Sequence, residues 1–436
     1  MQESGNKIGW ITGASIVIAN MVGAGVFTSL GLQLEFVQDP NYILLLWVLG
    51  GMMALSGAFS YAELGVHFRR SGGEYHFLSK IYHPILGYLS GWVSITVGFS
   101  APIALAAISV ADYIQIFAAL PMRIFASFII ILVAVIHSFT INNSSVFQTL
   151  ITVLKIFAIG IFIAFGLSFA DLPTIQDFKP LSTEFSNYSL AVAFVFVCFS
   201  YSGWNAAAYI TGEIESFKKN LPKALISGTL VVTALYIIIN FVFLKNASYS
   251  DLVGQVEVGQ IVATNLWGAN GGKMISSIII LILISSISGM IWVGSRVTQV
   301  LGEDYLIWNR YSKRNKNNVP VRAIWLQALI SIAFVYSGSF EQVLIYSSFI
   351  IQLFSLLAVI GLVILRSSKK HKVDKDAYSS PLYPLPQLFF ILTSMWVLFF
   401  LMLDKPKESI FGVLSLFLAA ITYFINKRLS NKSSHD

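Results

Sequence analysis

Residues 16–28 read IVIANMVGAGVFT, an apolar run with two glycines two positions apart near its middle. This run lies within a longer apolar stretch, 8–30, that is long enough to cross a bilayer as a helix. Glycine costs about 1 kcal/mol relative to alanine in a helix interior, and it permits backbone conformations that side chains forbid. The sequence therefore predicts a membrane-spanning helix that is broken from Gly23 to Gly25.

A break at membrane depth has to be buried in protein or line a cavity, because lipid satisfies no backbone N–H or C=O group. It would leave a new half-helix near Val26, whose free N–H groups and positive dipole end favour an anion such as a carboxylate. The alternative, close helix packing through small residues, stays open on the glycines alone.

A second interruption occurs near the middle of the chain, where residues 196–205 read FVCFSYSGWN. A small polar cluster ending in Gly203 breaks an apolar run there, as the glycine pair does in the first span. Matching interruptions in corresponding spans are the best sequence indicator of a transporter's substrate site. The two interruptions together predict a site in which both breaks take part.

The composition is typical of a chain embedded in lipid. Of the 436 residues, 56% are hydrophobic and only 11% are charged, whereas soluble domains carry roughly a quarter charged residues. The single cysteine excludes an internal disulfide, and the six histidines do not cluster, so neither a metal nor a cofactor is expected. The formal charge of +7 is distributed as membrane topology requires, so no nucleic-acid partner is expected.

Apolar segments of about 20 residues recur along the whole chain, and they predict about twelve transmembrane helices in an all-α membrane protein. The predicted spans are 8–30, 42–65, 85–113, 122–138, 144–169, 188–212, 221–244, 274–300, 323–338, 342–365, 386–403 and 410–426. The fourth is short, and the ninth is interrupted by polar residues. No soluble domain fits in the connections, so 1–436 is expected to be a single transmembrane domain.

Lys and Arg are distributed unevenly between alternate connections. Connections on the same side of the membrane as the N-terminus hold 21 Lys and Arg residues, and connections on the opposite side hold 6. Lys155 lies inside a span. Because Lys and Arg accumulate in cytoplasmic loops, both termini are expected in the cytoplasm. The basic run 366–375 is interpreted as a topological anchor rather than a lipid-binding site. The short loops are typical of a bacterial inner-membrane protein.

Four landmarks resemble, in order and spacing, the amino acid–polyamine–organocation (APC) superfamily, and within it the L-type amino acid transporters and their bacterial relatives. They read GAGVF, YAELG followed by SGGEY, SGWN and NLPKA, and they lie at 23–27, 61–65 with 71–75, 202–205 and 220–224. The resemblance is clearest over 8–244. It implies a five-plus-five inverted repeat (LeuT-like), unwound in helices one and six, with repeats at 8–169 and 188–365 and two extra helices at 386–426.

The resemblance also implies a substrate site in and beside the two breaks. Its predicted residues are Met21, Gly23, Ala24, Gly25, Val26, Phe199, Ser202, Gly203 and Asn205. The N–H groups at 24–26 would hold a substrate carboxylate, and the carbonyls of Met21, Phe199 and Ser202 would hold its ammonium group. The ring of Phe199 would close over the substrate as an outer gate, or it is an ordinary packed aromatic.

Lys155 lies deep inside the fifth predicted span, where a lysine is costly unless carbonyls, hydroxyls or water pair with it. In some members of the superfamily a fifth-helix lysine stands where sodium-driven relatives bind a cation, which implies sodium independence. Its predicted partners are the eighth-helix hydroxyls of Ser285, Ser286 and Ser288. Lys155 is either a fixed tether between helices or a group that releases a proton during the cycle.

A neutral amino acid is the expected substrate, because no Asp or Glu is found well inside a predicted span and a cationic substrate usually needs a carboxylate. Ser202 stands where the family often has glycine, which favours small or medium side chains. The resemblance favours exchange. A proton-coupled symporter is the main alternative, and a cationic amino acid or polyamine transporter is a further one.

Proteins of two other classes fit less well. A channel needs a continuous polar lining, whereas polar residues here concentrate at two breaks. An intramembrane enzyme needs a nucleophile with its base or a metal, and no such motif is present, so no enzyme is expected. Some animal relatives bind a heavy chain through a cysteine after the third helix. Residues 113–122 contain none, so no disulfide-linked partner is expected, and a monomer is compatible with the sequence.

Overall fold

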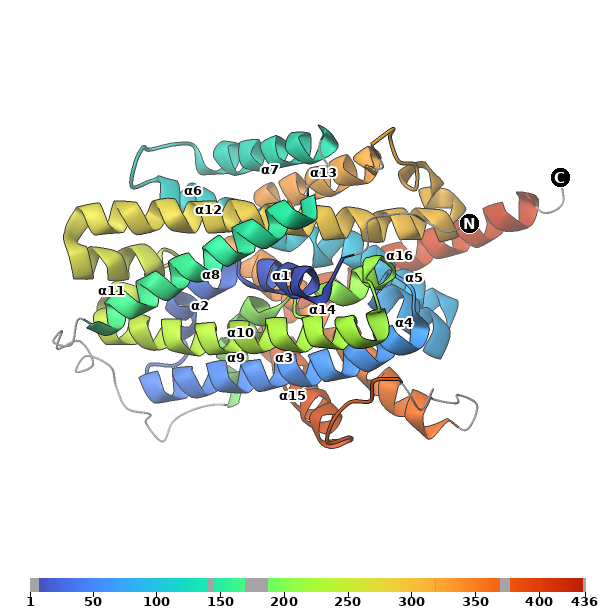
Figure 1. The fold of residues 1–436 in the computed structure, drawn as a ribbon, viewed down its shortest axis with the longest axis horizontal. Helices are drawn as coiled ribbons and strands as arrows, with labels where there is room; N and C mark the ends of the chain where they lie inside the picture. Colours follow the sequence, from blue (N-terminus) through green and yellow to red (C-terminus); the bar gives the residue numbers. More distant parts are fainter. Residues whose placement is uncertain (1–7, 140–143, 169–186, 318, 369–376, 434–436) are drawn as a thin grey trace.

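The computed structural model of this chain describes residues 8–139, 144–168, 187–317, 319–368 and 377–433. Within these ranges the chain is almost entirely helical, and its one β-bridge joins Ile8 to Ile214. The longest helices run roughly along one direction and pack side by side in a single bundle (Figure 1). The expected all-α fold is confirmed. The basic run 366–375 and the connection 169–186 lie largely or wholly outside the described residues.

Nine helical segments are found in the described residues up to 168. They are α1 (Trp10–Met21), α2 (Ala24–Leu34), α3 (Pro40–Phe68), α4 (Glu74–Ile81), α5 (Pro84–Val93), the π-helical turn η1 (Ser94–Gly98), α6 (Ser100–Ile114), α7 (Met122–Phe139) and α8 (Ser144–Ser168).

The second half continues in the same way. Its described segments are α9 (Asn187–Tyr201), the 3₁₀ helix η3 (Ala206–Glu213), α10 (Phe217–Asn246), α11 (Tyr249–Leu252), α12 (Val258–Asp304), η4 (Leu306–Tyr311), α13 (Val321–Ser337), α14 (Phe340–Ser367), α15 (Leu385–Asp404) and α16 (Pro406–Ser433).

The described residues include eleven helical stretches that are long and apolar enough to cross a membrane. The shorter apolar helix α13 occupies the place of the predicted ninth span, the one that polar residues interrupt. The chain is therefore a multi-pass membrane protein, as expected. The exact total of twelve spans stays a prediction, and so does the inverted relation between the two repeats.

Helix starts follow local capping chemistry. The Asp39 carboxylate accepts the N–H of Asn41 at 2.8 Å and Pro40 takes the first helical position, so α3 begins there. At the start of α14, Ser339 and Gln342 form a reciprocal capping box. These contacts satisfy N–H groups that the helix itself leaves without acceptors.

The helices differ in what surrounds them. Every residue of α2 is buried, and α1 lies near the centre of the bundle in Figure 1. By contrast, α8 exposes Leu150, Phe157 and Phe165, and α16 exposes Phe417. Large apolar side chains on the outside are what a lipid-facing surface needs. The stretch that carries the glycine pair is therefore enclosed by protein, as an interrupted helix requires.

The third span contains a π-helical turn. The N–H of Phe99 donates to the carbonyl of Ser94, five residues earlier, at 3.1 Å, which makes η1 a π-helical turn. Pro102 explains its position, because proline has no N–H to donate to the carbonyl of Gly98 four residues before it. Turns of this kind occur frequently at functional sites.

Candidate functional site

The first break separates α1 from α2. α1 ends at Met21 and α2 begins at Ala24, so only Val22 and Gly23 leave the helix. This break is shorter than predicted, because Ala24 and Gly25 are helical. A Cβ at Gly25 would lie 2.5 Å from the Cα of Ser200 on α9. The second glycine therefore permits a close helix contact rather than the unwinding, which is the alternative that the sequence left open.

The second break follows α9, where residues 202–205 form turns before η3 begins. Gly203 has a φ of +97°, a conformation that favours glycine. A Cβ at Gly203 would lie 2.8 Å from the carbonyl carbon of Asn20, in the last turn of α1. The two breaks are therefore adjacent, because Gly203 contacts the last turn of α1 and Gly25, in the first turn of α2, contacts α9.

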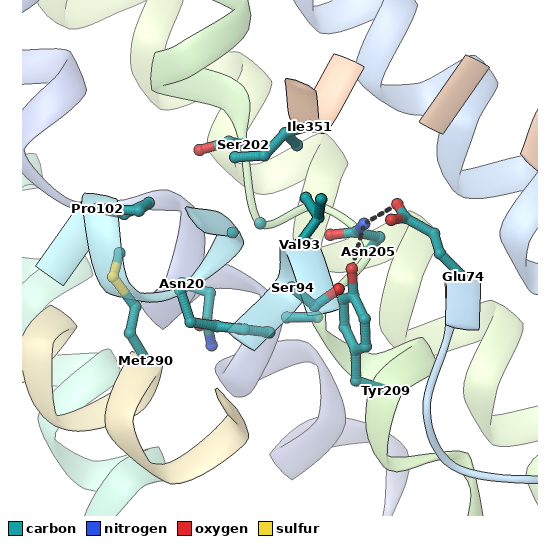
Figure 2. A pocket seen from close by; sticks show the side chains of 14 residues that line it. Asn20, Glu74, Val93, Ser94, Pro102, Ser202, Asn205, Tyr209, Met290 and Ile351 are labelled. Carbon is teal, nitrogen blue, oxygen red and sulfur yellow. Dashed lines mark hydrogen bonds between the residues drawn. The ribbon is translucent and has the colours of Figure 1, made fainter. Parts of the chain in front are cut away.

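A cavity of about 50 Å³ lies beside the second break. Ser202, Gly203 and Asn205 line it, together with Asn20 from α1 and residues of α4, α5, η1, α6, η3, α12 and α14 (Figure 2). The other six predicted substrate-binding residues do not line it. These are Met21, Gly23, Ala24, Gly25, Val26 and Phe199, all of which are buried. Three of the nine predicted substrate-binding residues therefore line the cavity, and the other six are packed inside the protein without lining it.

The first turn of α2 has the N–H groups that an anion site requires. Those at 24–26 precede the first intrahelical bonds, and the N-cap Gly23 offers them no side chain. No hydrogen bond from them to another part of the described chain is found. Their proposed role toward a carboxylate stays a prediction.

The carbonyl of Met21 is already engaged in this conformation. It accepts the Tyr236 hydroxyl at 2.6 Å and the Gly23 N–H at 2.9 Å, which uses both lone pairs. The same hydroxyl lies 3.1 Å from the carbonyl of Ser200, so Tyr236 bridges the two broken helices. The Phe199 carbonyl likewise accepts the Ser202 N–H at 2.9 Å. An ammonium group at Met21 has to replace one of these bonds.

Lys155 reaches the first break from α8. Its Nζ donates to the Val22 carbonyl and to Ser286 Oγ, each at 2.9 Å, and only 2% of the residue is exposed. The Ser286 hydroxyl also lies 2.6 Å from the Val22 carbonyl. One lysine therefore joins α8, α12 and the unwound residue of the first span.

The other two predicted partners of Lys155 do not reach it, so that part of the prediction was wrong. Ser288 Oγ lies 2.7 Å from Nε2 of His137 on α7. Ser285 Oγ is buried, and no partner for it is found in the described part of the chain. Successive positions on a helix point about 100° apart, so Ser285 and Ser288 lie about 100° and about 200° around α12 from Ser286 and face away from the side chain that Ser286 contacts.

Sequence reasoning missed two residues at the site. Tyr236 reads as an ordinary aromatic in an apolar span, and nothing in its neighbours marks it. Glu74 was noted only within the SGGEY motif, yet its buried side chain lines the cavity with Asn205 (Figure 2). The expectation of a neutral substrate rested on the absence of Asp and Glu well inside a predicted span, and it did not consider Glu74, which lies between two predicted spans. The motif itself was the available signal.

Neither a disulfide nor a metal centre is present in the described ranges. Cys198, the one cysteine of the sequence, is free. No group of three or more His, Cys, Asp or Glu side chains lies close enough to hold a metal ion where the chain is described.

Comparison with known proteins identifies the family. The sequence profile described as "Amino acid permease" matches residues 8–434. Serine/threonine exchanger SteT of Bacillus subtilis (strain 168) is 30% identical over 406 residues, which is 90% of each chain.

Two mammalian proteins are similar over nearly the whole chain. The human b(0,+)-type amino acid transporter 1 is 25% identical over 435 residues, 96% of this chain and 87% of that one. The mouse large neutral amino acids transporter small subunit 2 is 24% identical over 433 residues, 96% of this chain and 80% of that one. The chain therefore belongs to the amino acid permease family, within the APC superfamily of membrane transporters, and is not an enzyme.

Proposed function

We propose that the chain is a sodium-independent exchanger of neutral L-amino acids that works by alternating access. The main support is the adjacency of the two breaks, with Gly203 on Asn20 and Gly25 on Ser200. The free N–H groups that begin α2 favour a carboxylate, and the carbonyls that end α9 favour an ammonium group. An α-amino acid carries both charges on one carbon.

The contacts of Lys155 support sodium independence. Its ammonium group occupies a position between the Val22 carbonyl and Ser286 Oγ, both oxygen ligands of the kind that hard cations prefer. A charged ammonium group there repels a metal cation and already pairs with the oxygens that one would use. Transport then needs no sodium.

A small neutral substrate is supported by the size of the cavity, about 50 Å³, which has to widen even for a small amino acid. Glu74 is the one acidic residue on its lining, and three neutral donors already bind it. The relative from Bacillus subtilis, described as a serine/threonine exchanger, points to the same substrate class and to exchange.

Three further features belong to this proposal. The two five-helix repeats, 8–169 and 188–365, move relative to one another around the site, as inverted-repeat transporters do. Both termini lie in the cytoplasm, and the membrane is the inner membrane of a bacterium. Proton-coupled symport through Lys155 is the rival mechanism for the same site.

Transport into liposomes that contain the purified protein tests the proposal. Labelled serine should enter only when the vesicles hold unlabelled amino acid, saturably and with preference for the L-form, at the same rate with and without sodium. Uptake into empty vesicles driven by a pH gradient would establish the symporter instead. Sodium dependence or an ionic conductance would contradict the proposal outright.

A further inference from the structure

Glu74 lies outside the predicted spans but reaches the cavity. It is the first residue of α4, the short helix between α3 and α5. The residue is 3% exposed. Figure 2 shows its carboxyl group directed at Asn205, with Tyr209 on the other side of the same amide. A buried carboxylate is costly unless hydrogen bonds or a cation satisfy it, so its partners matter.

The two carboxylate oxygens of Glu74 have different surroundings. Oε1 accepts the Tyr61 hydroxyl at 2.5 Å, Ser355 Oγ at 3.0 Å and Asn205 Nδ2 at 3.1 Å. None of these three hydrogen bonds ends on Oε2. The Tyr209 hydroxyl is a fourth donor that acts on the carboxylate. Because each carboxylate oxygen has two lone pairs, Oε2 keeps the capacity to accept a donor from a molecule in the cavity that Glu74 lines.

No cation balances this carboxylate within the described chain. The groups that act on it electrostatically are Tyr61 from α3, Ser355 from α14, and Asn205 and Tyr209 around the second break, all of them neutral. Tyr61 and Tyr209 are the titratable members of that set. Burial is the largest influence, and it raises the pKa of Glu74 above its ordinary value, while the hydrogen bonds act in the opposite direction.

We infer that Oε2 of Glu74 is the acceptor that selects the substrate's side chain, and that the transporter prefers amino acids whose short side chain carries a hydrogen-bond donor, such as serine and threonine. This inference rests on the proposed function. A backbone bound at the breaks lies beside Asn20 and Gly203, and its side chain extends past Asn205 toward the carboxylate. A short side chain needs the least widening of this cavity.

The selectivity follows from the cost of an unsatisfied acceptor. A substrate hydroxyl donates a hydrogen bond to Oε2. An alkyl group of the same size excludes water from Oε2 and donates no hydrogen bond, so Oε2 is left unsatisfied. Serine carries a hydroxyl group where 2-aminobutyrate carries a methyl group, and the two are otherwise the same. O-methylserine keeps the oxygen but has no proton to donate. One charge-assisted hydrogen bond corresponds to a preference of roughly tenfold.

Competition against labelled alanine exchange in liposomes tests the inference, because alanine has no side-chain donor and reports the backbone site. The wild-type protein should be inhibited by serine roughly tenfold more strongly than by 2-aminobutyrate or O-methylserine. In Glu74→Gln, the amide oxygen can take the place of Oε1 and the NH₂ group that of Oε2. The NH₂ group of that variant donates a hydrogen bond where Oε2 accepted one. Inhibition by O-methylserine relative to inhibition by serine should therefore rise severalfold.

Ser355→Ala is the matched control, because it removes a donor from Oε1 and leaves Oε2 unchanged. It should keep the preference for serine, whatever its effect on the rate. If Glu74→Gln does not exchange alanine, the wild-type protein decides the question through pH. Lowering the pH through the raised pKa of Glu74 protonates the carboxylate, so the preference for serine over O-methylserine should narrow.

The outcomes separate this inference from the function on which it rests. If no amino acid is exchanged by the wild-type protein, the proposed function fails. If alanine is exchanged but serine and 2-aminobutyrate compete equally, the function stands and the inference is overturned. Wild-type ratios in Glu74→Gln also overturn it. So does a Glu74→Gln protein that loses only the pH dependence of transport, since Glu74 is then a proton site.

Discussion

Lys155 shows how a single residue can hold an unwound helix in place. The carbonyl of Val22 lost its helical partner when the chain left α1, and Nζ of Lys155 now donates to it. Ser286 is the second ligand of the same ammonium group. The charge is therefore satisfied by one group from the break and one from α12.

Ser286→Ala should lower the thermal stability of the purified protein and slow exchange, because it removes one of two partners from a buried charge. The expected cost is about 1–3 kcal/mol. Ser285→Ala is the control on the same helix, since the Ser285 hydroxyl has no partner where the chain is described. Thermal unfolding in detergent and serine exchange report both effects. Equal behaviour of the two variants would contradict the role of Ser286.

Lys155→Ala should impair exchange whether the lysine is a tether or a proton carrier, since the Val22 carbonyl loses a donor in both cases. Initial rates measured from pH 5 to pH 8 (about the range in which transport assays are practical) distinguish the roles. Retained exchange that has lost its pH dependence would mark a proton carrier. Unchanged uptake at every pH would exclude both.

The sequence is informative about some residues and silent about others. Lys155 stands out because a charge at membrane depth is rare. Its partner among three serines could not be chosen, because that depends on how α12 is rotated. Tyr236 could not be found at all, because its hydroxyl acts on carbonyls of two distant breaks. Glu74 was hidden by its place in a loop motif.

At the scale of elements, the two breaks can lie close together because two glycines have no side chain at the points of contact. Gly203 combines a positive φ with contact to Asn20, and Gly25 lets α9 approach α2. Glycine is required at these two positions for different reasons. The first is conformational and steric, and the second is steric alone.

Gly203→Ala should abolish exchange, because it introduces a Cβ 2.8 Å from the Asn20 carbonyl carbon and strains a left-handed backbone by about 1 kcal/mol or more. Gly160→Ala is the matched control in α8, where a Cβ would meet nothing within 4 Å. It should be tolerated or slightly stabilising. Exchange assays on both proteins, with size-exclusion profiles to verify folding, check this. An active Gly203→Ala protein would contradict the proposed geometry.

The predicted spans 42–65 and 386–403 agree closely with α3 (Pro40–Phe68) and α15 (Leu385–Asp404), because hydropathy determines what lipid accepts. The interruptions were harder to place. The first is shorter than its glycines indicated, since Gly25 serves packing. The π-helical turn Ser94–Gly98 was missed, although Pro102 is its cause, because a proline alone does not say how the helix accommodates it.

At the scale of the whole molecule, the distribution of Lys and Arg predicts that both termini are cytoplasmic. Labelling of introduced cysteines tests this directly, because Cys198 is the one native thiol. With Cys198 replaced by alanine, Ser430→Cys at the end of α16 should react only with a reagent that reaches the cytoplasmic side. Ala119→Cys, between α6 and α7, should react from outside. The reverse pattern, in sealed vesicles of known orientation, would contradict the predicted topology.

The overall architecture could be predicted from the sequence because lipid constrains it so strongly, and the match to the family over residues 8–434 agrees with that prediction. The inverted relation of the two repeats could not be derived from composition and rests on the resemblance. The side chains that line the cavity could not be listed either, since Asn20, Glu74 and Ser202 come from three distant segments.

The central claim is that the two broken helices bind one amino acid between them. An experimental structure of the protein with bound L-serine tests it most directly. The account predicts the carboxylate at the N–H groups of 24–26, the ammonium group at the carbonyls that end α9, and the side chain toward Glu74. An amino acid bound away from both breaks, or a continuous helix through Val22 and Gly23, would contradict it.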